Sequence, residues 1–200
     1  MKPLRPGLGQ AAVFLDRDGT MIEDVGYLDA LSRVEFYPWT VDAIRMLNRA
    51  GCPVVVVTNQ SGIARGLFDE AFVRDTHRHL DAHLAAGGAR VAAYYYCPHH
   101  TEGRVPAYTR ACDCRKPGRA LIDRAAADLG LDPARSFVVG DKWLDVQLGL
   151  AVGARAILVR TGTGAAEAMR PPAGVIAHAV VDNLAAAASW ILGNHKSEII

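Results

Sequence analysis

The chain has 200 residues, of which 50% are hydrophobic and 22% charged, a composition typical of a folded domain rather than of a disordered chain. Its formal net charge of +1 excludes the strongly basic surface of a general nucleic-acid or membrane binder. The apolar run Ala11–Leu15 is too short for the core of a signal peptide. No stretch approaches the roughly 20 apolar residues of a membrane span, so we expect a cytoplasmic protein.

Short apolar or β-branched runs predict strands, the first five of them buried on both faces. In chain order they are Ala11–Asp16, Pro53–Asn59, Val91–Cys97, Ser136–Asp141, Arg155–Arg160 and the weaker Ala177–Val181. Helical patterns occupy Thr40–Ala50, Glu70–Ala86, Arg119–Leu129, Trp143–Ala151 and Leu184–Leu192. This alternation predicts an α/β fold with a doubly wound, mostly parallel, Rossmann-like sheet, whose ligands bind beyond the carboxyl ends of the strands.

Two insertions, Gly19–Tyr37 and Pro98–Arg115, follow the first and third strands and are expected to lie over the ligand end of the sheet. Neither is long enough for a large cap domain with a core of its own. The stretch Gly162–Gly174 is predicted to be a surface loop, and Thr161–Gly164 a flexible connection rather than a nucleotide-binding loop. We expect one domain over residues 1–193 and a tail over residues 194–200.

The first predicted strand ends in two carboxylates, Asp16 and Asp18. Residues two apart in an extended chain share a side, so both side chains emerge together at the carboxyl end of the strand. A carboxylate held ionised by a metal can act as a nucleophile, and a protonated one as a general acid. The competing interpretation is an exposed acidic turn that ends at Gly19.

Neutral donors follow the second strand, in the order Thr58, Asn59, Gln60 and Ser61 before Gly62. Hydroxyl and amide groups at a glycine turn can hold a phosphate oxygen, although ordinary turn chemistry would use the same residues.

A basic pair, Arg115 and Lys116, precedes the helix predicted from Arg119, with Pro117 suited to be its first residue. Two cations beside the positive end of a helix dipole are unfavourable without an anion. The pair therefore indicates a phosphate site, and the alternative is a solvated basic pair.

The fourth strand ends at Asp141, at the same edge of the sheet as Asp16. These two carboxylates and the backbone carbonyl of Asp18 would offer Mg²⁺ the hard oxygen ligands that it prefers. Asp145 lies one helical turn beyond Asp141 and either supports the site or stabilises the N-terminus of a helix.

Three cysteines and two histidines bracket the second insertion: Cys97, His99, His100, Cys112 and Cys114. Three thiolates and one imidazole suit a closed, structural Zn²⁺ site that would rigidify the loop before Arg115, and spacing does not decide which histidine is the ligand. The alternative is three buried thiols beside exposed histidines. Cys52 is predicted to belong to the core, and His79 and His83 to a solvated helix face.

The motifs Asp16-Arg-Asp18-Gly-Thr, Thr58, Lys116 and Gly140-Asp141 resemble, in this order, the four motifs of haloacid dehalogenase-like phosphatases. The resemblance implies a Mg²⁺-dependent phosphatase in which Asp16 attacks phosphorus to form an aspartyl-phosphate. It further implies that Asp18 protonates the leaving alcohol and then activates water. Thr58 and Lys116 would hold the phosphoryl oxygens, and Asp16, Asp18 and Asp141 would bind Mg²⁺.

Members of this family with a zinc loop divide chiefly between heptose-bisphosphate phosphatases and histidinol-phosphatases, and the chain is similar to the first group. The similar segments are Thr58–Gly66, Tyr95–His100, Cys112–Pro117 and Asp24-Val-Gly26-Tyr27. The resemblance implies a monomer that removes the 7-phosphate of D-glycero-D-manno-heptose 1,7-bisphosphate, with His99 as the zinc ligand and Arg115 on the remote phosphate. The implied substrate-binding residues are Asp24, Gly26, Tyr27, Thr58, Asn59, Gln60, Ser61, Arg115, Lys116 and Lys142.

Three other functions remain open from the sequence: a histidinol-phosphatase or broader sugar-phosphate phosphatase, a receiver-like signalling domain, and a purely structural zinc module. A receiver-like domain keeps its phosphoaspartate and needs no general acid, so Asp18 and the zinc loop argue against it. A structural module would show no dependence on Mg²⁺.

Overall fold

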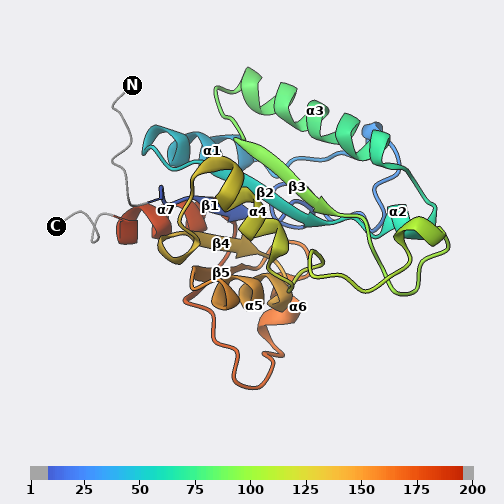
Figure 1. Ribbon diagram of the computed structural model, residues 1–200. Coiled ribbons are helices and arrows are strands. Elements are labelled where there is room, and N and C mark those ends of the chain that lie inside the picture. Colours follow the sequence, from blue (N-terminus) through green and yellow to red (C-terminus); the bar gives the residue numbers. More distant parts are fainter. Residues whose placement is uncertain (1–8, 196–200) are drawn as a thin grey trace.

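The computed structural model describes residues 9–195 and has a six-stranded parallel sheet at its centre (Figure 1). The strands lie in the order β3-β2-β1-β4-β5-β6, so the chain starts in the middle of the sheet and builds outward in both directions. Their bounds are β1 Val13–Leu15, β2 Val54–Asn59, β3 Ala93–Cys97, β4 Phe137–Gly140, β5 Arg155–Val159 and β6 Ala179–Val181. The predicted α/β fold is confirmed.

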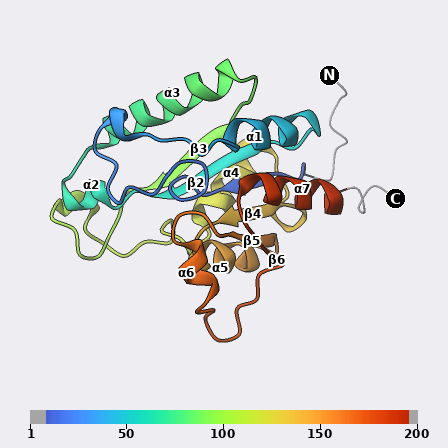
Figure 2. The same cartoon turned by 180° about the vertical axis from the view of Figure 1, so that it is seen from behind.

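Helices cover both faces of the sheet, with α1, α3 and α7 on one face and α4 and α5 on the other (Figures 1 and 2). Their bounds are α1 Thr40–Arg49, α2 Gly62–Arg65, α3 Glu70–Ala86, α4 Ala120–Leu129, α5 Trp143–Ala151, α6 Gly164–Ala168 and α7 Leu184–His195. Short 3-10 turns occur at Leu31–Arg33, Pro106–Tyr108 and Pro133–Arg135. No helix within residues 9–195 combines the length and hydropathy that a membrane crossing needs.

Alternating residues of the central strands supply two separate cores. Val13 and Leu15 of β1 face the helices α1 and α7, whereas Phe14 between them faces α4. In β2, Val54 and Val55 divide in the same way, in register with Val13 and Phe14. Because successive side chains of a strand point to opposite faces, a continuous apolar run is what a sheet covered on both faces requires.

Strand β3 differs from the prediction, because four of its five residues are only half-buried. It lies at an edge of the sheet, where tyrosine rings can pack while their hydroxyls reach the surface. Tyr94, Tyr95 and Tyr96 each donate a hydrogen bond to a carboxylate.

The C-terminal half contains a helix that the sequence analysis did not predict. Helix α6 lies inside the expected loop Gly162–Gly174. It is fixed against α5 because the indole of Trp143 donates to the carbonyl oxygen of Glu167 at 2.7 Å. Helix α7 continues to His195, beyond the predicted end at residue 192 and into the predicted tail, of which residues 196–200 lie outside the described part.

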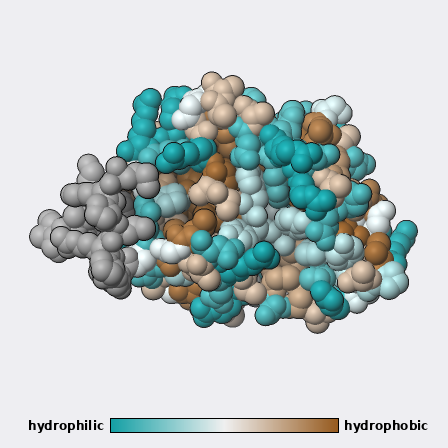
Figure 3. All heavy atoms as spheres, turned by 45° about the horizontal axis from the view of Figure 1, so that its top comes forward, coloured by the Kyte–Doolittle hydropathy of each residue, from teal (hydrophilic) through white to brown (hydrophobic). Residues whose placement is uncertain are grey.

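Helix α3 presents a largely polar outer surface, and hydrophilic side chains are interspersed with hydrophobic ones on the face seen in Figure 3. His79 and His83 are both exposed there, as predicted, and the ring of His83 stacks on Phe36 with 3.9 Å between centroids.

Candidate active site

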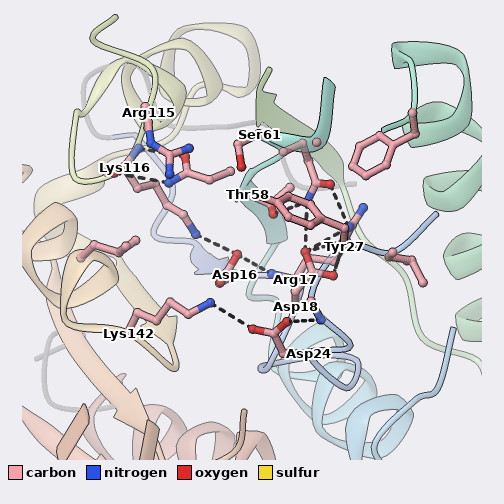
Figure 4. Close-up of a pocket in the computed structure, with 17 residues that line it drawn as sticks. Asp16, Arg17, Asp18, Asp24, Tyr27, Thr58, Ser61, Arg115, Lys116 and Lys142 are labelled. Atoms are coloured by element: carbon pink, nitrogen blue, oxygen red, sulfur yellow. Dashed lines mark hydrogen bonds and ion pairs between the residues drawn. The ribbon is translucent and has the colours of Figure 1, made fainter. Parts of the chain in front are cut away.

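A cavity of about 310 Å³ opens at the carboxyl ends of the central strands (Figure 4). Its walls come from the loop after β1, the turn after β2, the loop before α4 and the start of α5. All the residues predicted to be catalytic or substrate-binding line it: Asp16, Asp18, Asp24, Gly26, Tyr27, Thr58, Asn59, Gln60, Ser61, Arg115, Lys116 and Lys142. The topology explains this convergence, because parallel strands end at one edge of the sheet.

The two carboxylates after β1 share the cavity but have different partners. Asp16 is buried, and its Oδ1 accepts a hydrogen bond from the backbone N–H of Arg17 at 2.7 Å. Asp18 is more exposed and forms a bidentate ion pair with the guanidinium of Arg17, with Nη2 3.0 Å from Oδ2. The two carboxylates are therefore electrostatically distinct, as an acid and a nucleophile need to be.

Lys116 brings a cation to Asp16 from the opposite wall of the cavity. Its Nζ lies 2.8 Å from Asp16 Oδ1 and 2.7 Å from Asp145 Oδ1, and it donates to the carbonyl oxygen of Val57 at 2.9 Å. Burial alone would lower the pKa of Lys116, but the carboxylates of Asp145 and Asp16 outweigh it and raise that pKa. The two carboxylates therefore favour the charged form of the buried Lys116.

Asn59 fixes the backbone at Lys116. Its Oδ1 accepts the backbone N–H of Lys116 at 3.0 Å, and its Nδ2 donates to the carbonyl oxygen of the same residue at 3.3 Å. The loop before α4 is thus joined to the end of β2. The helix itself begins at Ala120, so Pro117 is not its first residue as the sequence suggested; a turn closed by Gly118 N–H to the Arg115 carbonyl comes first.

Three buried carboxylates, Asp16, Asp141 and Asp145, each bring an oxygen within 4.8 Å of the other two. The Oδ1 atom of Asp141 is buried and has no hydrogen-bond partner within residues 9–195. Burial, followed by the nearby charge of Asp16, raises the pKa of Asp141 to about 6. Hard oxygen donors with an unsatisfied buried oxygen fit a divalent cation such as Mg²⁺. The Asp18 carboxylate stands outside this group, so Asp18 can join it only through its backbone.

A hydrogen-bonded chain links the turn after β2 to Asp18. The Nε2 group of Gln60 lies 3.0 Å from both Asp18 Oδ2 and Thr58 Oγ1, and its Oε1 accepts from Arg17 Nη2 at 3.0 Å. Arg17 is only 2% exposed. Sequence reasoning missed it, although an arginine between two acids at a buried strand end is itself a signal of an internal ion pair.

The outer part of the cavity carries the other predicted substrate-binding residues. Lys142 Nζ lies 3.1 Å from Asp24 Oδ2, and Asp24 Oδ1 accepts the backbone N–H of Gly26 at 2.9 Å. Tyr27 is 42% exposed at the rim. Arg115 lines the same cavity, and its Nη1 is a buried donor with no hydrogen-bond partner in the described chain.

The cysteine–histidine group also assembles. The Sγ atoms of Cys97, Cys112 and Cys114 lie 3.2–3.5 Å apart, and His99 Nδ1 lies 3.3 Å from the sulfur of Cys114. His100 points elsewhere, since its Nδ1 accepts the backbone N–H of Glu102. Three thiols and one imidazole at this spacing fit a tetrahedral zinc ion. Cys52 is buried in the core, as predicted.

The fold, together with the carboxylates at the carboxyl ends of its central strands, defines a hydrolase of the haloacid dehalogenase type. The family model described as HAD-hydrolase-like matches residues 113–187. The D-glycero-beta-D-manno-heptose-1,7-bisphosphate 7-phosphatase of Escherichia coli K12 is 45% identical over 153 residues, which cover 76% of this chain and 80% of the relative. That of Haemophilus influenzae is 42% identical over 76% of this chain and 82% of its own.

A crystal structure of the D,D-heptose 1,7-bisphosphate phosphatase from B. bronchiseptica, complexed with magnesium and phosphate, superposes with a TM-score of 0.82. It is 32% identical and covers 92% of this chain and 99% of its own. The chain therefore belongs to the haloacid dehalogenase-like phosphatases, in the branch that holds the heptose-1,7-bisphosphate 7-phosphatases. The predicted family and class of enzyme, a phosphoric monoester hydrolase, are confirmed.

Proposed function

We propose that the protein removes the 7-phosphate of D-glycero-D-manno-heptose 1,7-bisphosphate through a phosphoaspartate on Asp16, leaving the heptose 1-phosphate. The observation that carries the proposal is the buried Asp16 carboxylate, 2.8 Å from Lys116 Nζ in a cavity that also holds Asp18 and Arg115. The names of the relatives, at 42–45% identity, support this choice of substrate.

Phosphoryl transfer needs in-line positioning and neutralisation of the phosphoryl oxygens more than covalent assistance. Lys116 would neutralise one oxygen, and the Thr58 hydroxyl and the turn to Ser61 would donate hydrogen bonds to others. Asp16, Asp141 and the backbone carbonyl of Asp18 would hold Mg²⁺, which supplies further charge neutralisation when bound. Asp145 would hold Lys116 in position without itself contacting the substrate.

Asp18 is the proposed acid and base. An oxygen of Asp16 attacks phosphorus, the bond from phosphorus to the sugar oxygen breaks, and that oxygen takes the proton of Asp18. Asp18 then accepts a proton from water as the water attacks the phosphoaspartate, which releases inorganic phosphate and restores both carboxyl groups. Gln60 and Arg17 orient Asp18 for both transfers.

The remainder of the sugar phosphate would contact the outer cavity. The buried, unpaired Nη1 of Arg115 would bind the 1-phosphate, and Lys142, Asp24, Gly26 and Tyr27 would line the sugar. A second phosphate gives Arg115 a partner that histidinol phosphate lacks.

We further propose that zinc on Cys97, His99, Cys112 and Cys114 is structural, because four protein donors leave no position open for water. The proposal also keeps the monomer that the resemblance to the family implies and the single domain over residues 1–193 that the sequence predicts. It places the enzyme in the cytoplasm, where a reducing environment keeps such thiols free for metal.

Steady-state kinetics with Mg²⁺ and both anomers of the heptose bisphosphate test the assignment against histidinol phosphate. We expect the higher kcat/KM with one of the heptose anomers. A higher kcat/KM for histidinol phosphate would reject the substrate, and turnover unaffected by removal of Mg²⁺ would reject the mechanism.

A further inference from the structure

The Thr161–Gly164 segment follows β5 and lies against the loops of the site, rather than forming a flexible connection as the sequence suggested. The Oγ1 of Thr161 donates to the carbonyl oxygen of Gly19 at 2.6 Å. The backbone N–H of Gly162 donates to the hydroxyl of Tyr37 at 3.1 Å. Both acceptors belong to the insertion after β1, so the segment is fixed to the loop that follows Asp18.

The next residue, Thr163, holds one oxygen of Asp141. Its backbone N–H and its Oγ1 both donate to Asp141 Oδ2, each at 2.9 Å. The other oxygen, Oδ1, is the buried atom without a partner in the described structure, and Asp141 itself is 0% exposed. Two donors on one oxygen fix the rotation of the carboxylate and decide which oxygen remains available.

Glycine makes this close approach possible. Gly162 has φ +56°, and a Cβ there would overlap Asp141 Oδ2 and lie 2.6 Å from the Cα of Gly19. A Cβ at Gly164 would overlap the carbonyl oxygen of Val159. One glycine on each side of Thr163 therefore allows the backbone N–H and the hydroxyl of Thr163 to reach the buried carboxylate of Asp141.

We propose that Thr163 is a positioning residue for the Mg²⁺ site: by holding Oδ2 of Asp141 it presents Oδ1 to the cation and so sets the affinity for Mg²⁺. The inference rests on the proposed function, which includes the cation at Asp16 and Asp141. Loss of a hydrogen-bond partner behind a metal ligand typically weakens metal binding by about 10–100-fold. The backbone N–H of Thr163 remains in every variant, so we expect the lower end of that range.

Calorimetric titration of the zinc-loaded protein with Mg²⁺ alone, without substrate, tests the inference. Thr163→Val keeps the shape of the side chain, removes the donor and fills the space a water could use, whereas Thr163→Ser keeps the donor. Thr163 is exposed overall, so neither change opens the core. We expect Thr163→Val to bind Mg²⁺ about tenfold more weakly than wild type. Thr163→Ser should bind within about twofold of wild type, because its hydroxyl can make the same hydrogen bond.

Thr76→Val is the matched control, because its buried hydroxyl donates only within helix α3, to the carbonyl oxygen of Phe72. It should leave Mg²⁺ affinity unchanged even if it lowers thermal stability. Wild-type affinity in Thr163→Val, or equal weakening in Thr163→Ser, overturns the inference. If the wild-type protein itself binds no Mg²⁺, the proposed metal site fails first, and the two results are distinguishable.

Discussion

The ammonium nitrogen of Lys116 lies 2.8 Å from Oδ1 of Asp16, and both side chains are buried. The contact joins the loop before α4 to the end of β1 across the cavity. A second carboxylate, on Asp145, holds the same nitrogen at 2.7 Å. Lys116 therefore balances two buried negative charges at the point where a phosphoryl group would add more.

Lys116→Met should lower both activity and stability. Removing one preorganised donor to the transition state typically reduces kcat by about 10²–10³-fold. Leaving a buried carboxylate without its cation destabilises the folded protein by about 3–5 kcal/mol. Steady-state kinetics and denaturant unfolding measure the two effects. The double variant Lys116→Met/Asp145→Asn removes one stranded charge, so it should regain part of the stability but none of the activity. A kcat/KM within about tenfold of wild type in Lys116→Met would contradict the role given to Lys116.

Asp18→Asn should separate the two half-reactions. A sugar alcohol needs protonation to leave, and a general acid contributes about 10²–10⁴-fold, so turnover of the heptose bisphosphate should fall by that factor. With p-nitrophenyl phosphate, whose leaving group needs no proton, phosphorylation should continue while hydrolysis stalls. Rapid-quench experiments should then detect accumulated phosphoenzyme. Asp24→Asn, on the sugar side of the cavity, is the control. It should raise the KM for the heptose bisphosphate without accumulation of phosphoenzyme.

The sequence was sufficient to predict that certain polar residues at strand ends lie together at one edge of the sheet. Asp16, Thr58 and Asp141 each follow an apolar run, and a parallel sheet brings such positions to one edge whatever the loops do. The cysteine–histidine group could also be predicted from the sequence, because three cysteines and a histidine at this spacing are typical of a zinc site.

Residues whose environment depends on tertiary contacts were missed. Arg17 stands between two acids in the sequence, but its burial also depends on a hydrogen bond to Gln60, from the turn after β2. Thr163 belongs to a polar, glycine-rich stretch whose composition indicates a loop. Its hydrogen bonds to Asp141 depend on how β5 and β4 pair, which local sequence does not encode.

Loss of the zinc group should loosen the loop that carries Lys116. In Cys112→Ser we expect zinc content, measured by mass spectrometry, to fall strongly and the thermal midpoint to drop, because metal-binding free energy contributes directly to folding. Activity should fall as well, since Lys116 follows the cluster by two residues. Cys52→Ala is the control: it removes a thiol from the core and should keep the zinc. A Cys112→Ser variant with full zinc occupancy would argue against the site.

His77 should make the stability of the fold depend on pH. Burial, with a smaller effect of the Arg17 charge, lowers the pKa of His77 to about 3, and its Nε2 has no partner among the described residues. The unfolded chain binds the proton at about pH 6.5, so the stability due to neutral His77 is complete above that pH and declines by about 1.4 kcal/mol per unit as pH falls toward 3.

Unfolding of wild type and His77→Phe between pH 7 and pH 5 isolates this effect, because other titrations, including those of the zinc ligands, cancel in the difference. Phenylalanine keeps the stacking on Tyr94, where the ring centroids lie 4.3 Å apart, and cannot be protonated. The variant should lose stability less steeply as pH falls. Parallel pH profiles for the two proteins would exclude His77 as the source.

Arg115→Met should change the choice of substrate rather than the chemistry. A charge-assisted hydrogen bond contributes about 1.5–3 kcal/mol, so the variant should lose about tenfold to a hundredfold in kcat/KM for the bisphosphate. For the heptose 7-phosphate, which lacks the 1-phosphate, the loss should be small. The ratio of the two kcat/KM values therefore reports whether Arg115 meets the remote phosphate. Arg104→Met, an exposed position in the same loop, should leave that ratio at its wild-type value. Equal losses on both substrates in Arg115→Met would instead place Arg115 at the transferred phosphate, beside Lys116.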